Sequence, residues 1–362
     1  MTPRPSRFAR WPRAAAAAVL ALLATLMIAG IAAAPVPINA QAAEAAARPG
    51  QGGADAALYR TIVAGMRTGG GYYPVAARSL RDGGFPLRPF LAFRLPTLAS
   101  LLAAVPPMAA RAAMLLLIAG VIAAWTMRLG EVFAAPAALA AASLLVLAGV
   151  IAAAQPDMIV FHEIWAALLI ALSLALRRDR AWAASLAIGL GAALIRETAI
   201  AYLLAMAVLA LVEGRRREAA GWAAGIAVFA LFLAWHAGQV AGVTGPADPA
   251  SPGWGGLGGW PFLLSSVRLT GAFALLPPWT VAMLLPLALL GWIGCRARFA
   301  WRVAAMLLGY AAMVMLFARP DNFYWSLLLG PLLPLGLAFA PAALIDLLRS
   351  LRPLDSGTAA RQ

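Results

Sequence analysis

Long apolar runs, separated by short polar connections, occupy most of the chain. Each run is about as long as a membrane-spanning helix, which needs roughly 20 apolar residues, or is somewhat shorter. The runs cover residues 14–34, 112–127, 134–154, 161–176, 181–194, 198–212, 219–238, 279–294, 301–317 and 323–345. We therefore predict an all-α fold, a polytopic bundle of about ten transmembrane helices.

The segment 35–108 is the one long polar connection, and its part from 55 to 97 is rich in tyrosine and arginine. Residues 55–66 place four apolar side chains at helical spacing, namely Leu58, Ile62, Val63 and Met66. We expect this loop to form short amphipathic helices beside the membrane. The apolar stretch 95–105 is expected to be a half-helix that ends at Pro106, while 260–277 reads as an amphipathic interfacial segment.

The composition excludes an ordinary soluble domain, because 63% of the residues are hydrophobic and only 12% are charged, with a mean hydropathy of +0.85. The single cysteine, Cys295, excludes an internal disulfide and a cysteine metal cluster. All 28 basic residues are arginine, and the net charge is +14. No basic–aromatic module for nucleic acid is present, so we assign the basic charge to membrane topology.

Four arginines precede the first apolar run, and Ala32-Ala33-Ala34 at its end resembles a signal-peptide cleavage site. The run of 21 apolar residues is long for a signal peptide and suits a span, so we predict an uncleaved helix.

The domain prediction is one membrane domain over 1–362. It comprises a first span at 14–34, an external loop at 35–108, the remaining spans at 109–345 and a cytoplasmic tail at 346–362.

The run from Trp182 to Leu211 is either one helix of 30 residues or two short ones. The basic clusters at 177–180 and 214–217 should both be cytoplasmic, which requires an even number of crossings between them. We therefore predict two short helices with Arg196-Glu197 at the outer turn. With this choice both termini are cytoplasmic, and the expected location is a bacterial inner membrane.

The outer helix ends carry the polar sequences QPDxxxFHE (155–163), IRET (195–198) and ARPDNFYW (318–325). Ionisable groups close to hydrocarbon are costly unless they are paired or line a watery cavity, so we expect an outward-facing polar cavity. The alternative is that they are ordinary interfacial residues. With the first loop, these sequences supply the candidate binding residues Tyr59, Tyr73, Arg88, Arg94, His162, Glu163, Arg196, Glu197, Arg319 and Asp321.

Asp55 is the candidate catalytic residue, because a carboxylate at the head of a loop helix can act as a general base towards an acceptor hydroxyl. Asp is also a favoured helix N-cap, which is the simpler interpretation from composition alone. Arginines at a membrane surface favour phosphate, and the loop carries Arg60, Arg67, Arg78, Arg81, Arg88 and Arg94. His162 and Glu163 are adjacent, which makes a poor metal pair. The sequence indicates no particular cofactor, and a divalent metal stays an open alternative.

The first span followed by an outside loop with Asp55, Tyr59, Gly65 and Tyr72-Tyr73, then Pro86, Arg88, Pro89, Arg94 and Pro96, resembles the GT-C superfamily of membrane glycosyltransferases. The resemblance implies transfer of a sugar from a polyprenyl-phosphate donor to a lipid, glycan or other envelope acceptor on the non-cytoplasmic face. It also implies that Asp55 is the base and that Arg196 and Arg319 hold the donor phosphate. The implied partners are this donor, the acceptor and membrane lipids.

Two other functions stay open at this stage. One is a transporter or flippase for an anionic lipid or glycan, with Arg196-Glu197 as a gating pair. The other is a non-catalytic membrane scaffold. A cavity confined to the outer half with Asp55 on its wall favours the glycosyltransferase, whereas a path that continues to the cytoplasmic face favours the transporter.

Overall fold

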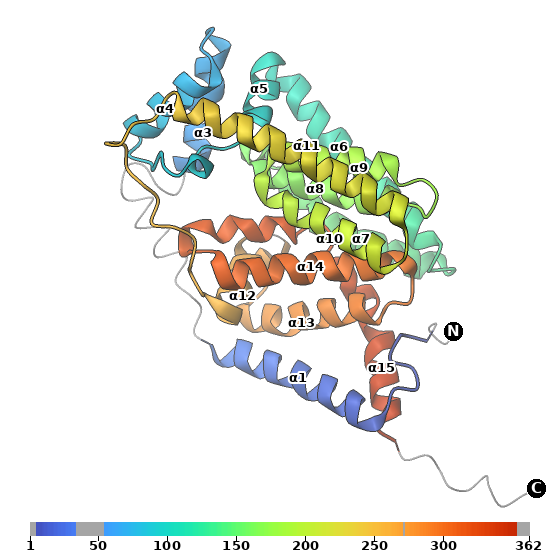
Figure 1. Cartoon of the computed structure of the whole chain (residues 1–362). Helices are drawn as coiled ribbons and strands as arrows, with labels where there is room; N and C mark the ends of the chain where they lie inside the picture. The colour runs from blue at the N-terminus through green and yellow to red at the C-terminus, as the bar shows by residue number, and fades with distance from the viewer. Residues whose placement is uncertain (1–4, 34–53, 271, 353–362) are drawn as a thin grey trace, which may run out of the picture.

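The computed structural model describes residues 5–33, 54–270 and 272–352, and every regular element in these ranges is a helix. The long helices form a bundle, and a group of short helices covers one end of it (Figure 1). The bundle helices are α1 (Arg13–Ala32), α6 (Pro107–Gly130), α7 (Pro136–Val150), α8 (His162–Leu176), α9 (Ala183–Ile195), α10 (Ile200–Val212), α11 (Arg216–Ala241), α13 (Pro278–Gly294) and α14 (Arg298–Phe317).

Five helices of the described chain are long and apolar enough to cross a membrane: α1, α6, α7 with the following 3-10 turn η2 (Ile151–Ala154), α11 and α14. The others are shorter, and α8 is buried along most of its length. Its one central polar group is satisfied, because Ser173 Oγ lies 2.8 Å from Ser185 Oγ and 2.7 Å from Tyr202 Oη. This architecture is compatible with an integral membrane protein.

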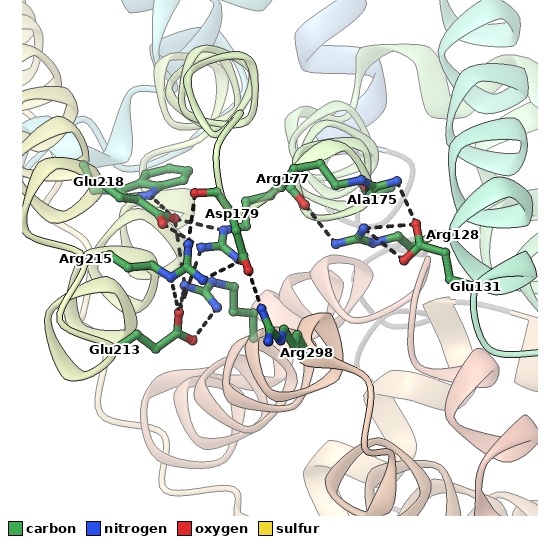
Figure 2. Close-up of polar contacts among 12 residues, drawn as sticks. Arg128, Glu131, Ala175, Arg177, Asp179, Glu213, Arg215, Glu218 and Arg298 are labelled. Atoms are coloured by element: carbon green, nitrogen blue, oxygen red, sulfur yellow. Dashed lines mark hydrogen bonds and ion pairs between the residues drawn. The ribbon is translucent and has the colours of Figure 1, made fainter. Parts of the chain in front are cut away.

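One end of the bundle, which we call the ion-pair end, is closed by a network of arginines and carboxylates (Figure 2). Arg177 bonds to both oxygens of Glu218, at 2.9 and 2.6 Å. Arg302 reaches Glu213 at 2.5 and 2.8 Å. Asp179 accepts from Arg215 and Arg298, each at 2.7 Å. The network therefore joins the last turn of α8 to the ends of α10, α11 and α14 that lie beside it.

The prediction of two short helices between the basic clusters is confirmed. Arg196 has an extended backbone that ends α9, and a short 3-10 turn, η4 (Glu197–Ala199), leads into α10. Because Arg215 pairs with Asp179, the clusters 177–180 and 214–217 lie at the same end of the bundle, as predicted. The turn at Arg196 lies at the opposite end, beside the first residues of α8.

The last apolar run, 323–345, is not the single helix that its hydropathy suggested. It is divided into the 3-10 segments η6 (Pro320–Leu328) and η7 (Pro334–Ala338) and the helix α15 (Ala340–Ser350). Prolines at 331, 334 and 341 remove backbone donors, which prevents a continuous α-helix. Gly336 also lies directly on α13, where a Cβ would come within 2.0 Å of the Ala288 carbonyl oxygen.

The end opposite the ion-pair network is covered by the first loop. Its elements are α3 (Ala54–Arg67), α4 (Tyr72–Asp82), the short turn η1 (Phe90–Ala92) and α5 (Pro96–Ala104). The predicted helix at 55–66 and the half-helix at 95–105 are thus both present. The loop packs on the bundle through its own apolar faces, and Tyr73 Oη lies 3.1 Å from His236 Nδ1 of α11.

The predicted interfacial segment 260–277 is instead packed inside the bundle. Its helix α12 (Gly259–Thr270) buries Phe262, Leu263 and Val267. The connection before it, residues 243–258, crosses from α11 to α12 over the covered end, and we call it the strap. Its Ser251 N–H donates to Arg88 O at 2.6 Å, and Arg81 holds Asp248 through two bonds of 2.7 Å.

Candidate functional site

A cavity of about 1040 Å³ lies between the first loop and the bundle, at the end opposite the ion-pair network. The first loop supplies one wall, the starts of α8 and η6 supply the polar floor, and the strap supplies part of the rim. Six of the predicted site residues line it: Asp55, Tyr59, Arg94, His162, Arg319 and Asp321. The remaining lining is mostly apolar, including Leu58, Ile62, Leu98 and Leu102 from α3 and α5.

Asp55 stands in the first turn of α3, and Tyr59 follows one turn later on the same face. The carboxylate is half-buried on the cavity wall and makes no hydrogen bond or ion pair with any described residue. Burial raises the pKa of Asp55 to about 6, and the negative charges of Glu163 and Asp321 act in the same direction, while Arg94 opposes them. An unpartnered carboxylate with such a pKa suits a general base near neutral pH.

Arg94 lies in the turn between η1 and α5, with its guanidinium at the cavity wall. Its Nε donates to Tyr59 Oη at 2.9 Å and its Nη2 to Tyr324 Oη at 2.8 Å. Tyr72 holds the backbone in place by donating to Arg94 O. Burial raises the pKa of Tyr59 well above its usual value, so this phenol stays neutral beside the cation.

Arg94 differs from the fully buried arginines of the bundle in the charge of its partners. Those arginines each have a carboxylate oxygen within 3.3 Å: Arg128 with Glu131, Arg177 with Glu218, Arg196 with Glu163 and Arg302 with Glu213. The nearest carboxylate contact of Arg94, with Glu197 Oε1, is 3.9 Å long. The cavity wall therefore carries a positive charge whose closest partners are neutral phenols, and N–H groups of Nη1 are left over for a ligand.

Three predicted residues, Glu163, Arg196 and Glu197, form a buried polar cluster behind this wall. Arg196 is 1% exposed, and its Nε lies 2.7 Å from Glu163 Oε1. Its Nη1 pairs with Glu197 Oε1. We expected Arg196 to face the cavity, but two carboxylates enclose it and it is not among the lining residues.

His162 and the pair Arg319–Asp321 complete the polar part of the lining. Neither ring nitrogen of His162 has a hydrogen-bond partner among the described residues, and the ring stands edge-on to Tyr59 at 5.2 Å between centroids. Arg319 forms an ion pair with Asp321, in which Nε lies 3.0 Å from Oδ1. Its Nη1 donates to Gly253 O of the strap at 2.6 Å. Most of the donors of Arg319 are therefore already engaged by the protein.

The other first-loop arginines mainly fasten the loop to the rest of the chain. Arg60 pairs with Asp157 at 3.0 Å, whereas Arg67 donates to Leu102 O of the same loop at 2.7 Å. Arg88 donates to Asp248 O at 2.9 Å. Of the predicted binding residues, Arg88 and Tyr73 do not line the cavity. Three loop arginines, Arg60, Arg81 and Arg88, thus hold the loop against the rest of the chain.

The cavity also includes residues that sequence reasoning did not select. Tyr324 lines the cavity and belongs to the polar run 318–325, from which only Arg319 and Asp321 were predicted as site residues. Ser251 and Trp254 come from the strap, whose glycine-rich sequence gave no signal of a site. Their placement depends on contacts with Arg88 and Arg319, which are distant in sequence.

Among the described residues, no group of three or more His, Cys, Asp or Glu side chains could hold a metal ion. Fold and site together define a helical bundle, compatible with a membrane protein, that holds a polar and apolar cavity at one end. Comparisons with protein-family models, curated proteins and solved structures found no match to this chain.

Proposed function

We propose that this protein is a membrane glycosyltransferase that moves a sugar from a polyprenyl-phosphate donor to an acceptor hydroxyl. The observation that carries the proposal is that one cavity wall presents both the Asp55 carboxylate, which has no hydrogen-bond or ion-pair partner among the described residues, and the Arg94 cation, whose nearest carboxylate contact is 3.9 Å long. The lining combines apolar residues of α3 and α5 with polar groups at Asp55, at Arg94 and at the starts of α8 and η6, which suits a substrate with a hydrocarbon chain and an anionic, hydroxyl-rich head. The resemblance to the GT-C superfamily supports the same reading.

In the proposed reaction, Asp55 takes the proton of the acceptor hydroxyl, and the acceptor oxygen attacks the anomeric carbon of the sugar. The bond between that carbon and the phosphate oxygen breaks, and the phosphate leaves with the bonding electrons. Arg94 stabilises the charge that develops on this leaving group, and Tyr59 and Tyr324 fix the guanidinium in place. The anomeric configuration is inverted because the attack is direct.

The proposed topology has ten crossings, made by the nine bundle helices and the segment 320–350, with α12 as a short internal helix. The ion-pair end carries the basic connections 177–180, 214–217 and 296–302, so we place it in the cytoplasm. Ser6 N–H donates to Asp346 at 2.6 Å, and Arg7 Nε donates to Cys295 O at 2.8 Å, which ties both ends of the described chain to that side. The cavity then opens on the non-cytoplasmic side of a bacterial inner membrane.

A transporter or a scaffold would fit the geometry less well. The residues that line the cavity all come from the covered end, whereas the other end is closed by buried ion pairs such as Arg177–Glu218. A transport path would have to cross this network. A scaffold has no use for a carboxylate that lacks a partner among the described residues, or for a cation hydrogen-bonded to phenols, on the wall of a large cavity.

The decisive experiment replaces Asp55 by Asn, which keeps the shape of the side chain but cannot accept the proton. We expect transfer to fall by about 10²-fold or more, because a general base is lost. The readout is mass spectrometry of cell-envelope glycans and polyprenyl-phosphate sugars, and of transfer by the purified protein. Asp157→Asn is the matched control, since that side chain is 78% exposed and is not among the cavity-lining residues. Near-normal transfer by Asp55→Asn would rule out the proposed mechanism.

A further inference from the structure

Four charged side chains behind and on the cavity wall form a chain of alternating sign. Glu163 lies 2.7 Å from Arg196, Arg196 pairs with Glu197, and Glu197 lies 3.9 Å from Nη1 of Arg94. The side chains of Glu163 and Arg196 are each 1% exposed, whereas Arg94 and Glu197 are each 16% exposed. The formal charges of the four groups sum to zero, and Arg94, the last member, is the one that lines the cavity.

Glu197 is the shared member of this chain, because it stands between two guanidinium groups. It pairs directly with Arg196 and only at 3.9 Å with Arg94. An anion bound to Arg94 would lie close to this carboxylate and would be repelled by it. Among the residues that the structure describes, Arg196 is the cation in direct contact with Glu197, so it offsets that repulsion and holds the carboxylate back from Arg94.

We propose that Arg196 is a positioning residue that keeps Glu197 away from Arg94, so that Arg94 is free to bind the phosphate of the donor. This inference rests on the proposed function, because it concerns the same anion. It replaces direct phosphate binding by Arg196, which has no access to the cavity while Glu163 and Glu197 enclose it. Arg196 therefore keeps Arg94 available to the phosphate without contacting the phosphate itself.

The test is a double-mutant cycle with Arg196→Gln and Glu197→Gln, singly and together. The probe is a polyprenyl monophosphate without sugar, and its Kd is measured with the purified, full-length protein in lipid nanodiscs. In Arg196→Gln the four-residue chain has a net charge of −1, and Glu197 has only Arg94 left as a cationic partner. We expect the Kd to rise by about tenfold or more. In the double variant the net charge returns to zero, and we expect the Kd to return to within about threefold of the wild-type value.

Two results would overturn the inference. If the Kd is unchanged in folded Arg196→Gln protein, Arg196 is only a structural partner of the two carboxylates. If the double variant binds as weakly as Arg196→Gln, Arg196 itself contacts the phosphate. Glu197→Gln gives an independent test should Arg196→Gln fail to fold. It removes the repelling carboxylate, so the Kd should fall severalfold, and an unchanged or higher Kd would contradict the proposal.

A matched control comes from the ion-pair end, where Arg302 is 2% exposed and pairs with Glu213. Arg302→Gln removes an equally buried guanidinium far from the cavity, and the Kd should stay constant.

Arg94→Ala separates this inference from the proposed function. If Arg94→Ala leaves the Kd unchanged, the proposed anion site is itself wrong. If Arg94→Ala weakens binding but Arg196→Gln does not, only the role of Arg196 is wrong.

Discussion

Asp55 shows how a side chain that is ordinary in sequence acquires chemical character from its neighbours. In isolation, Asp near a helix start reads as a cap, and the structure does place it in the first turn of α3. Burial and the nearby carboxylates of Glu163 and Asp321 raise the pKa of Asp55 to about 6, although Arg94 acts against them. None of these neighbours is close to Asp55 in sequence, so the sequence alone could not predict this shift.

The raised pKa of Asp55 predicts the pH dependence of transfer. The base must be deprotonated, so kcat/KM should be high above pH 7 and should be lost as the pH falls through about 6. Asp321→Asn removes one of the charges that raise this pKa, so the midpoint should move to lower pH. The measurement is kcat/KM from pH 4.5 to 8 for both proteins. A flat profile, or a midpoint that Asp321→Asn moves upward, would contradict the role given to Asp55.

At the scale of elements, the strap is the part of the site that sequence reasoning missed. Gly256 lies so close to the backbone of residue 318 that a Cβ would come within 2.0 Å of the Ala318 carbonyl oxygen. Leu257 N–H also donates to Leu316 O at 3.3 Å. These contacts keep Ser251 and Trp254 on the cavity wall.

Gly256→Ala should therefore loosen the strap. We expect a loss of about 1–3 kcal/mol in the free energy of unfolding, as is typical of overpacking, together with weaker donor binding. Gly255→Ala is the control, because a Cβ at that position meets no atom within 4 Å. Thermal unfolding in detergent and donor Kd values for the two variants measure the effect. Equal stability and equal affinity in both variants would show that the close approach at Gly256 is unimportant.

The helices were largely predictable because their signals are local. Run length and apolar spacing predicted α3, α11 and α14 within a few residues, and the charge pattern predicted the break at Arg196. The run 323–345 was misjudged because hydropathy outweighed its prolines, which divide the segment. Tyr59 and Tyr324, which bind Arg94, and Glu163, which pairs with Arg196, are distant in sequence, so only the tertiary structure could show that one cation faces the cavity and the other does not.

At the scale of the whole molecule, the two ends of the bundle have opposite characters. One is closed by buried pairs of opposite charge, as Figure 2 shows, and the other contains the cavity. The proposed topology places them on opposite sides of the membrane. It is therefore testable without any assay of transfer.

The topology predicts which introduced cysteines react from outside the cell. In a Cys295→Ala background, Arg78→Cys is exposed on α4 at the cavity end and Arg217→Cys is exposed on α11 at the ion-pair end. A membrane-impermeant maleimide should label Arg78→Cys in intact cells, and Arg217→Cys only after permeabilisation. Labelling of Arg217→Cys in intact cells would contradict the proposed ten-span topology.

The long sequence separation between the parts of the cavity wall also bears on how the protein is made. The Arg81–Asp248 bonds join residues 167 positions apart, and the Arg94–Tyr324 bond spans 230 positions. The ribosome therefore releases the first loop long before its partners exist. Arg81 and Arg88 lack their partner until the strap has been made, and Arg94 lacks Tyr324 until the segment after α14 has been made. Completion of the site is thus one of the last events of biogenesis, and a chain arrested before Tyr324 would hold the loop with Arg94 still lacking this partner.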